Sequence, residues 1–162
     1  MYKRQVSGSA TALKLSGATI IDGAGGTING TGGGKIILDN ATGNTIAPSG
    51  LLTVNATIAN GNGNKVTFTS STTTNSTILL TGANTWTGAT TISAPNSRAA
   101  TVSVSSIGNW GPGIPGNLGA PTTSTDGTIG ISLANAASSA ILKYTGTGET
   151  TIRIDVTHGD GV

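Results

Sequence analysis

The chain has 162 residues, enough for one domain, with 26 glycines, no cysteine and 9% charged residues. Average proteins contain about 7% glycine and about 25% charged residues, so the chain is rich in glycine and poor in charge. Intrinsic disorder usually needs a high net charge and few apolar residues, whereas this chain carries +2 and is 35% hydrophobic. The composition therefore excludes a typical disordered protein and favours a solenoid of small aliphatic residues and many turns.

The positive charge comes mainly from the first residues. Residues 1–5, MYKRQ, resemble a translated adaptor scar, and we expect them to be non-native. Without Lys3 and Arg4, six basic residues balance six acidic ones, so no basic surface for nucleic acid is predicted. We assign residues 6–162 to a single solenoid fragment of a protein that we expect to extend beyond both ends. The sequence contains neither a signal-peptide core in residues 1–20 nor an apolar run of about 18 residues.

Short strands are predicted throughout, because clusters of apolar and β-branched residues alternate with turns of Gly, Asn, Asp and Ser. No segment has the composition of a long amphipathic helix. Turns are predicted at Asp22-Gly23, at Asn29-Gly30 with the glycines that follow, and at 60–64. In chain order, the predicted strands are 13–15, 18–21, 27–28, 35–38, 45–47, 51–54, 56–58, 65–69, 78–80, 90–92, 101–105, 128–133, 141–144 and 150–156.

The segment 77–92, TILLTGANTWTGATTI, is the clearest of these units. It predicts two strands, 78–80 and 90–92, joined by a link that contains Gly82, Asn84, Trp86 and Gly88. Strands this short are marginal on their own, so we expect the unit to stack on similar units, each covering the apolar residues of the next.

Residues 80–92, LTGANTWTGATTI, resemble the autotransporter-associated β-strand repeat, whose pattern is an apolar residue, Thr/Ser-Gly, Asn-Thr, an aromatic residue, Thr-Gly and Thr-Ile. Residues 105–121 and 141–154 are similar to segments that often follow this repeat in large bacterial surface proteins. The resemblance spans about half of the chain, from Thr77 to roughly Val156. The likeness departs at Ile152, which follows Thr151 where a polar residue is expected.

The resemblance implies an all-β fold, a right-handed parallel β-helix, in the passenger region of a Gram-negative autotransporter. A rung of 20 or more residues would divide the chain into roughly six or seven coils, and stacking at about 4.8 Å would give a rod about 30 Å long. The implied location is extracellular or at the cell surface. Contact with the outer membrane would come only through a C-terminal barrel domain missing from this chain.

The segment 108–121, GNWGPGIPGNLGAP, is too rich in Gly and Pro to lie inside a sheet. We predict a loop that protrudes from the rod between two coils, and loops of this length often carry function. Its Trp110 either anchors the loop to the rod or faces a ligand. We expect Trp86 to pack on a neighbouring coil at a turn, with stacking on a sugar as the alternative.

Catalytic and metal-binding motifs are not evident in the sequence. Gly30–Lys35 lacks the spacing of a phosphate-binding loop and has Ile36 where Ser or Thr is needed. Glycoside chemistry would need paired carboxylates, whereas the acidic residues are scattered. Asp155, His158 and Asp160 are a conceivable metal site, but an exposed tail is the simpler interpretation. The acidic residues are Asp22, Asp39, Asp126, Glu149, Asp155 and Asp160.

The sequence therefore predicts a structural and display scaffold, from a secreted or surface passenger domain, with adhesion as an added role. It predicts no enzymatic activity and no cofactor. The expected partners are an unknown surface ligand or glycan, and stacking neighbours in the full-length chain. The alternative is a carbohydrate-active β-helix protein, either a polysaccharide lyase or a glycan-binding protein. A third hypothesis is a segment of a trimeric phage or appendage fibre.

Overall fold

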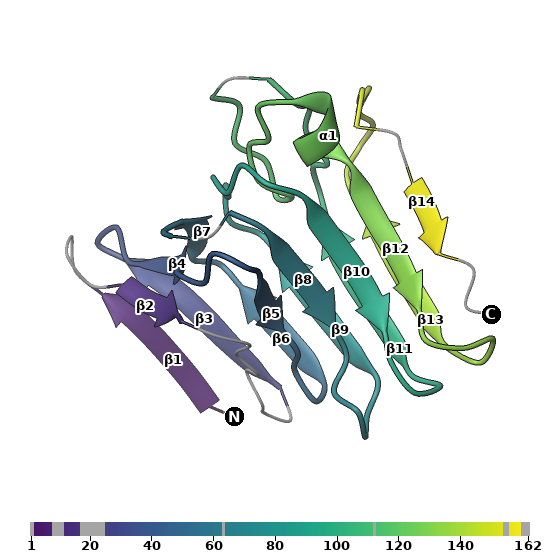
Figure 1. Ribbon diagram of the computed structural model, residues 1–162. Helices are drawn as coiled ribbons and strands as arrows, with labels where there is room; N and C mark the ends of the chain where they lie inside the picture. Colours follow the sequence, from purple (N-terminus) through teal and green to yellow (C-terminus); the bar gives the residue numbers. More distant parts are fainter. Residues whose placement is uncertain are drawn as a thin grey trace.

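The computed structural model describes residues 2–7, 12–16, 25–62, 64–111, 113–153 and 156–159, with the backbone alone for 2–7 and 156–159. The described chain forms three parallel sheets, and within each sheet the strands stack one after another along a common axis (Figure 1). Sheet A contains, in spatial order, β1 (Tyr2–Ser7), β3 (Gly26–Thr31), β6 (Leu51–Val54), β9 (Ser76–Leu80), β11 (Ala99–Val104) and β13 (Ser139–Tyr144). Sheet B contains β2 (Ala12–Leu15), β4 (Lys35–Leu38) and β7 (Thr57–Asn60). Sheet C contains β14 (Val156–Gly159), β12 (Ile129–Leu133), β10 (Thr90–Ala94), β8 (Val66–Thr69) and β5 (Asn44–Ile46).

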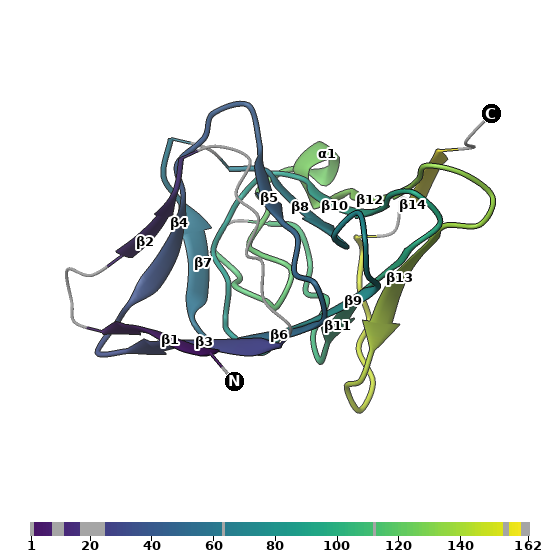
Figure 2. The same ribbon diagram turned by 90° about the horizontal axis from the view of Figure 1, so that it is seen from below.

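The chain visits the sheets in turn, and each circuit adds one strand to the next position of a sheet. In Figure 2, where successive strands follow one another from left to right, sheet A lies along the lower side, sheet C along the upper side and sheet B at the left, with the interior between them. Leu51 of β6 pairs with Thr77 of β9, 26 residues later, and Ser76 of β9 pairs with Ala100 of β11, 24 residues later. This parallel coiling confirms the predicted β-solenoid, in which no segment can bury its apolar residues without its neighbours.

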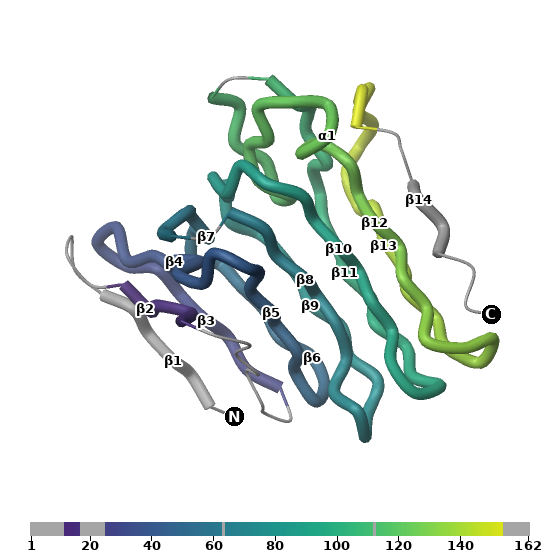
Figure 3. The backbone as a smooth tube through the Cα atoms, viewed as in Figure 1, coloured from purple at the N-terminus to yellow at the C-terminus, as the bar shows by residue number. Residues whose placement is uncertain are grey.

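The number of coils differs from the predicted six or seven. The described chain makes about four full turns, β3–β5, β6–β8, β9–β10 and β11–β12, with a partial turn at each end. The reason is an unequal turn length: Ala99 of β11 pairs with Ser139 of β13, 40 residues later, because a long insertion separates β11 from β12. The tube in Figure 3 shows this insertion as the irregular green segment beside α1 (Ser124–Gly127).

Most strands lie where the sequence predicted them, but two details differ. The predicted turn at Asn29-Gly30 lies inside β3, and the chain turns at Gly32 and Gly33, whose φ angles are +61° and +85°. Residues 150–153 of the predicted last strand are irregular. The reason is local: Thr151 Oγ1 accepts from the Arg153 amide, a side chain-to-backbone bond that competes with a strand. The strand predicted at 18–21 and the turn at 22–23 lie outside the described residues, and residues 2–5, predicted to be non-native, contribute to β1.

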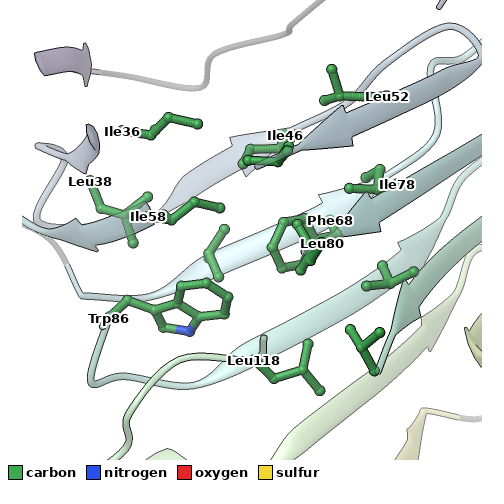
Figure 4. Packing of buried hydrophobic residues seen from close by; sticks show 14 of the residues in the cluster. Ile36, Leu38, Ile46, Leu52, Ile58, Phe68, Ile78, Leu80, Trp86 and Leu118 are labelled. Carbon is green, nitrogen blue, oxygen red and sulfur yellow. The ribbon is translucent and has the colours of Figure 1, made fainter. Parts of the chain in front are cut away.

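The interior consists of side-chain ladders that run from turn to turn. Along β9, burial alternates as expected for a strand with one inward face: Ser76, Ile78 and Leu80 are buried, and Thr77 and Leu79 are partly exposed. Two such ladders, from sheets A and C, meet in the core (Figure 4). Burial of each large aliphatic residue stabilises the fold by about 1.5–3 kcal/mol. The ladders are Ile28, Val54, Leu80 and Val104 in sheet A and Ile46, Phe68, Ile92 and Ile131 in sheet C.

The outward positions are occupied mainly by hydroxyl and amide residues. Thr45, Thr67 and Thr91 are paired on successive strands of sheet C, and all are partly exposed. At the end of sheet A, Asn55 Nδ2 donates to Asn29 Oδ1 at 2.7 Å and Thr81 Oγ1 donates to Asn55 Oδ1. Threonine suits this position because it is β-branched and also polar.

In the described chain, sheet B ends at β7, and the link within the repeat-like segment closes this side of the core. The Thr85 amide donates to the Ile58 carbonyl at 2.8 Å, and the Ile58 amide donates to Asn84 Oδ1 at 2.7 Å. Asn84 Nδ2 in turn donates to the Asn117 carbonyl at 2.7 Å. The buried Asn84 side chain therefore supplies the hydrogen bonds that another strand of sheet B would have made.

Candidate ligand-binding pocket

The irregular insertion between β11 and β12 is a loop where the sequence predicted one, but only part of it protrudes. Gly113, Ile114 and Pro115 are exposed, whereas 116–121 are buried. Leu118 is fully buried in the core cluster, and the Ala120 amide donates to the Trp86 carbonyl at 2.8 Å. The second half of the predicted loop, 116–121, therefore covers the core beyond the last described strand of sheet B.

Asn117 fixes the position of this wall. Its Oδ1 accepts from the amides of Ser105 and Ser106, at 2.9 and 3.0 Å, and its Nδ2 donates to the Gly82 carbonyl at 3.0 Å. The side chain is nearly fully buried. Because both ends of one amide are used, Asn117 joins the insertion to the preceding turn and to the end of β11.

Glu149, which follows β13, holds the start of the insertion at 106–108. Its carboxylate accepts from the amides of Ile107 and Gly108, at 2.8 and 2.6 Å, and from the Ser106 hydroxyl at 3.3 Å. Carboxylates that bind backbone amides make strong, charge-assisted hydrogen bonds. Glu149 thus has a structural role, and so do Asp39, which pairs with Lys14 at 3.5 Å, and Asp126, which receives the Thr123 hydroxyl at the start of α1.

Arg153 is the most unusual charged residue of the described chain, because its side chain is only 3% exposed. Nε donates to the Gly127 carbonyl at 3.1 Å, and Nη1 donates to the carbonyls of Ile107 and Leu118 at 3.0 and 2.6 Å. Nη2 is buried without a hydrogen-bond partner in the described chain. Burial lowers the pKa of the guanidinium well below its ordinary value, to about 10, and the nearby Glu149 charge acts in the opposite direction.

These elements enclose a pocket of about 430 Å³, within the usual range for small-molecule sites. Trp110 forms one wall and is held close to Gly127, where an added Cβ would lie 2.9 Å from the Trp110 Cβ. Ile152, which is 57% exposed, forms part of the rim. The described lining residues are Trp110, Ser124, Thr125, Gly127, Thr128, Ile152 and Arg153, none of which is acidic.

The structure separates the two predicted ligand residues. Trp86 is fully buried; its ring lies 5.9 Å from that of Phe68, tilted by 58°, and its Nε1 donates to Thr90 Oγ1 at 3.1 Å. It packs in the core and has no free face for a sugar. Trp110 is 37% exposed and lines the pocket. It packs against Gly127 of α1, within the same insertion, and its role toward a ligand stays a prediction.

Sequence reasoning missed Arg153, the residue that gives the pocket its charge. The available signal was weak: an arginine between Ile152 and Ile154 in a charge-poor chain. Across the described residues, no group of three His, Cys, Asp or Glu side chains could hold a metal ion. Asp155 and Asp160 lie outside the described residues, as does the side chain of His158.

Comparison of the chain with protein-family models, curated proteins and solved structures finds no match. The likeness to the autotransporter-associated repeat thus remains a prediction based on residues 80–92, 105–121 and 141–154. Within the described part of the chain, no helix has the length and apolar character needed to cross a bilayer.

Proposed function

We propose that this chain is a structural and display scaffold, part of a secreted or surface-exposed passenger domain of a Gram-negative autotransporter. The observation that carries the proposal is the coil-on-coil ladder with a 24- to 26-residue register, interrupted by one long insertion in the described chain that presents an exposed segment, 113–115. Such a ladder makes a stiff support, and recognition then belongs to the irregular insertion that it carries rather than to the regular coils.

The carbohydrate-active alternative has a specific observation in its favour, since the pocket combines an aromatic wall with a buried arginine. A lyase needs a base that accepts a proton from the sugar. Arg153, with a pKa of about 10, keeps its proton at neutral pH, and three backbone carbonyls hold its side chain. These features support the binding of a glycan, within an adhesive scaffold, over its cleavage.

Display at the cell surface tests the main proposal. The chain, with an epitope tag inserted at Ile114, would be placed between an export signal and an outer-membrane autotransporter barrel in a Gram-negative host. We expect an antibody to label intact cells, because Ile114 is 52% exposed. A matched fusion that carries a tightly folded cytosolic domain of similar length serves as control. The control fusion should stall during export and be labelled only after lysis. The same behaviour of the chain itself would contradict the proposal.

Activity assays separate the scaffold from the enzyme. The purified chain would be incubated with neutral and acidic polysaccharides, followed by measurement of reducing ends and of the ultraviolet absorbance of unsaturated products. We expect no product above that of a heat-denatured sample. Cleavage that disappears in Arg153→Lys would favour the lyase alternative.

A further inference from the structure

We propose that the pocket between Trp110 and Arg153 binds the carboxylate-bearing sugar unit of an acidic glycan. The inference deepens the adhesive part of the proposed function and rests on it, by naming a site and a ligand class. In this arrangement the sugar carboxylate accepts a hydrogen bond from Arg153, the sugar ring lies against the Trp110 indole, and the sugar hydroxyls meet the hydroxyl side chains of the lining.

The first step is the charge of the pocket. Arg153 is almost fully buried, and the three acceptors of its hydrogen bonds are neutral carbonyls, so within the described chain the cation has no directly bonded anion. Glu149, which acts on it electrostatically, uses its oxygens on the amides of Ile107 and Gly108. A buried cation of this kind is costly unless an anion compensates it.

The second step is the free donor. Nε and Nη1 of Arg153 are used by carbonyls, and Nη2 is the guanidinium nitrogen without a partner among the described residues. Buried donors without partners are rare in proteins, and each requires an explanation. Arginine binds carboxylates with particularly favourable geometry, so a ligand carboxylate that reaches the buried Nη2 from the pocket would satisfy the free donor and compensate the charge.

The third step is the rest of the lining. Trp110, which is partly exposed, lines the pocket together with three hydroxyl-bearing residues, Ser124, Thr125 and Thr128. Aromatic rings pack well on the apolar faces of sugar rings, and hydroxyls exchange hydrogen bonds with sugar hydroxyls. A sugar acid uses the cation, the ring and the hydroxyls together, whereas an acidic peptide would leave most of the hydroxyls unused.

The binding experiment uses the whole chain, with a short oligogalacturonate as the acidic probe and its methyl ester as the neutral match. Calorimetry gives the affinity. Both tryptophans emit, but a change of emission on binding is assigned to Trp110, because Trp86 is buried away from the ligand. We expect the acid to bind and to change the Trp110 emission, and we expect the ester to bind at least roughly tenfold more weakly, since the charge-assisted bond is lost.

Substitution of Arg153 itself risks the fold, so the decisive variants are at Ile152, on the exposed rim. Ile152→Asp should weaken binding of the acid roughly fivefold at low salt, and Ile152→Lys should strengthen it by a similar factor, with both effects shrinking at high ionic strength. Ile114→Asp is the control, because Ile114 is 52% exposed in the same insertion but does not line the pocket. It should leave the affinity unchanged.

Several results would overturn the inference. Equal binding of the acid and the ester would remove the role of the carboxylate, and equal effects of Ile152→Asp and Ile114→Asp would remove the site. Acetate or phosphate that binds as tightly as the oligomer would indicate a simple anion site, and tighter binding of a polyglutamate peptide would indicate a protein ligand. If the acidic probe does not bind but the tagged chain is displayed on cells, this inference fails and the scaffold proposal stands.

Discussion

Asn84 and Asn117 are buried amides that replace backbone hydrogen bonds where the regular sheets end. Asn84 joins the Ile58 amide to the Asn117 carbonyl, and Asn117 joins β11 to the Gly82 carbonyl. Each amide is satisfied by backbone donors and acceptors, at least one of them from another turn, and such pairing is the condition for burying a polar group at low cost. The asparagine of the repeat-like segment is therefore a structural residue in this fold.

The first prediction concerns Asn84→Ala. The substitution leaves the Ile58 N–H and the Asn117 carbonyl without this partner in the interior, so we expect the free energy of unfolding to fall by about 2–4 kcal/mol. Asn55→Ala is the control: Asn55 also bonds across turns, to Asn29, but it is exposed, and water can replace its bonds at a cost below about 1 kcal/mol. Urea denaturation measures both, and similar losses in the two variants would contradict the argument.

The second prediction concerns pH and Arg153. Its pKa of about 10 in the folded chain lies well below the ordinary value of an arginine because of burial. Between these two values the unfolded chain binds more protons than the folded chain, so the stability contributed by Arg153 rises with pH. Below pH 10 the cost of the buried charge is fully present.

The measurement is the free energy of unfolding of the wild type minus that of Arg153→Gln as a function of pH, which cancels the titration of lysine and tyrosine. We expect this difference to rise above about pH 10, with a slope of up to about 1.4 kcal/mol per pH unit. A flat or falling difference would show that burial does not lower this pKa.

At the scale of elements, the insertion 105–128 has two parts with different roles. Its exposed part, 113–115, projects from the solenoid, whereas 116–121 replaces a strand of sheet B and covers Trp86. Gly119 shows how close this contact is: its φ is +84°, and an added Cβ would lie 2.8 Å from Cε2 of Trp86. Glycine is needed there for both the backbone conformation and the space.

The third prediction compares the two parts. Leu118→Ala should lower the free energy of unfolding by about 2–5 kcal/mol, because Leu118 is fully buried and the cavity would not refill. Ile114→Ala removes an aliphatic side chain from the exposed part, and we expect a change within about 0.5 kcal/mol. Thermal and urea unfolding give both values. If Leu118→Ala were as mild as Ile114→Ala, then 116–121 would not belong to the core.

Much of the element pattern was predictable, and the pocket was not. Strands such as β9 and β10 were identified because apolar alternation and turn residues are local signals. The pocket depends instead on Arg153, which contacts carbonyls at Gly127, Leu118 and Ile107, up to 46 residues away. An irregular segment has no periodicity from which such contacts can be inferred, so the buried half of 108–121 was missed for the same reason.

At the scale of the whole molecule, the solenoid is held together by neighbour-to-neighbour pairing. β13 is the edge strand of sheet A in the described chain, and Ile141 on it is 42% exposed. Exposed edge strands offer free backbone groups to other chains. We therefore expect this chain to self-associate through such edges.

The fourth prediction tests this edge. Ile141 and Leu51 occupy the same outward row of sheet A, linked by the pairs Leu51–Thr77, Thr77–Thr101 and Thr101–Ile141. Leu51, 54% exposed, lies on β6 in the interior of the sheet. Ile141→Lys should reduce self-association, because a lysine at an edge opposes the docking of a second strand, whereas Leu51→Lys should not. Light scattering across a concentration series measures both. Equal reductions would mean that exposed apolar surface, rather than the strand edge, drives association, and a wild-type chain that stays monomeric throughout would remove the premise.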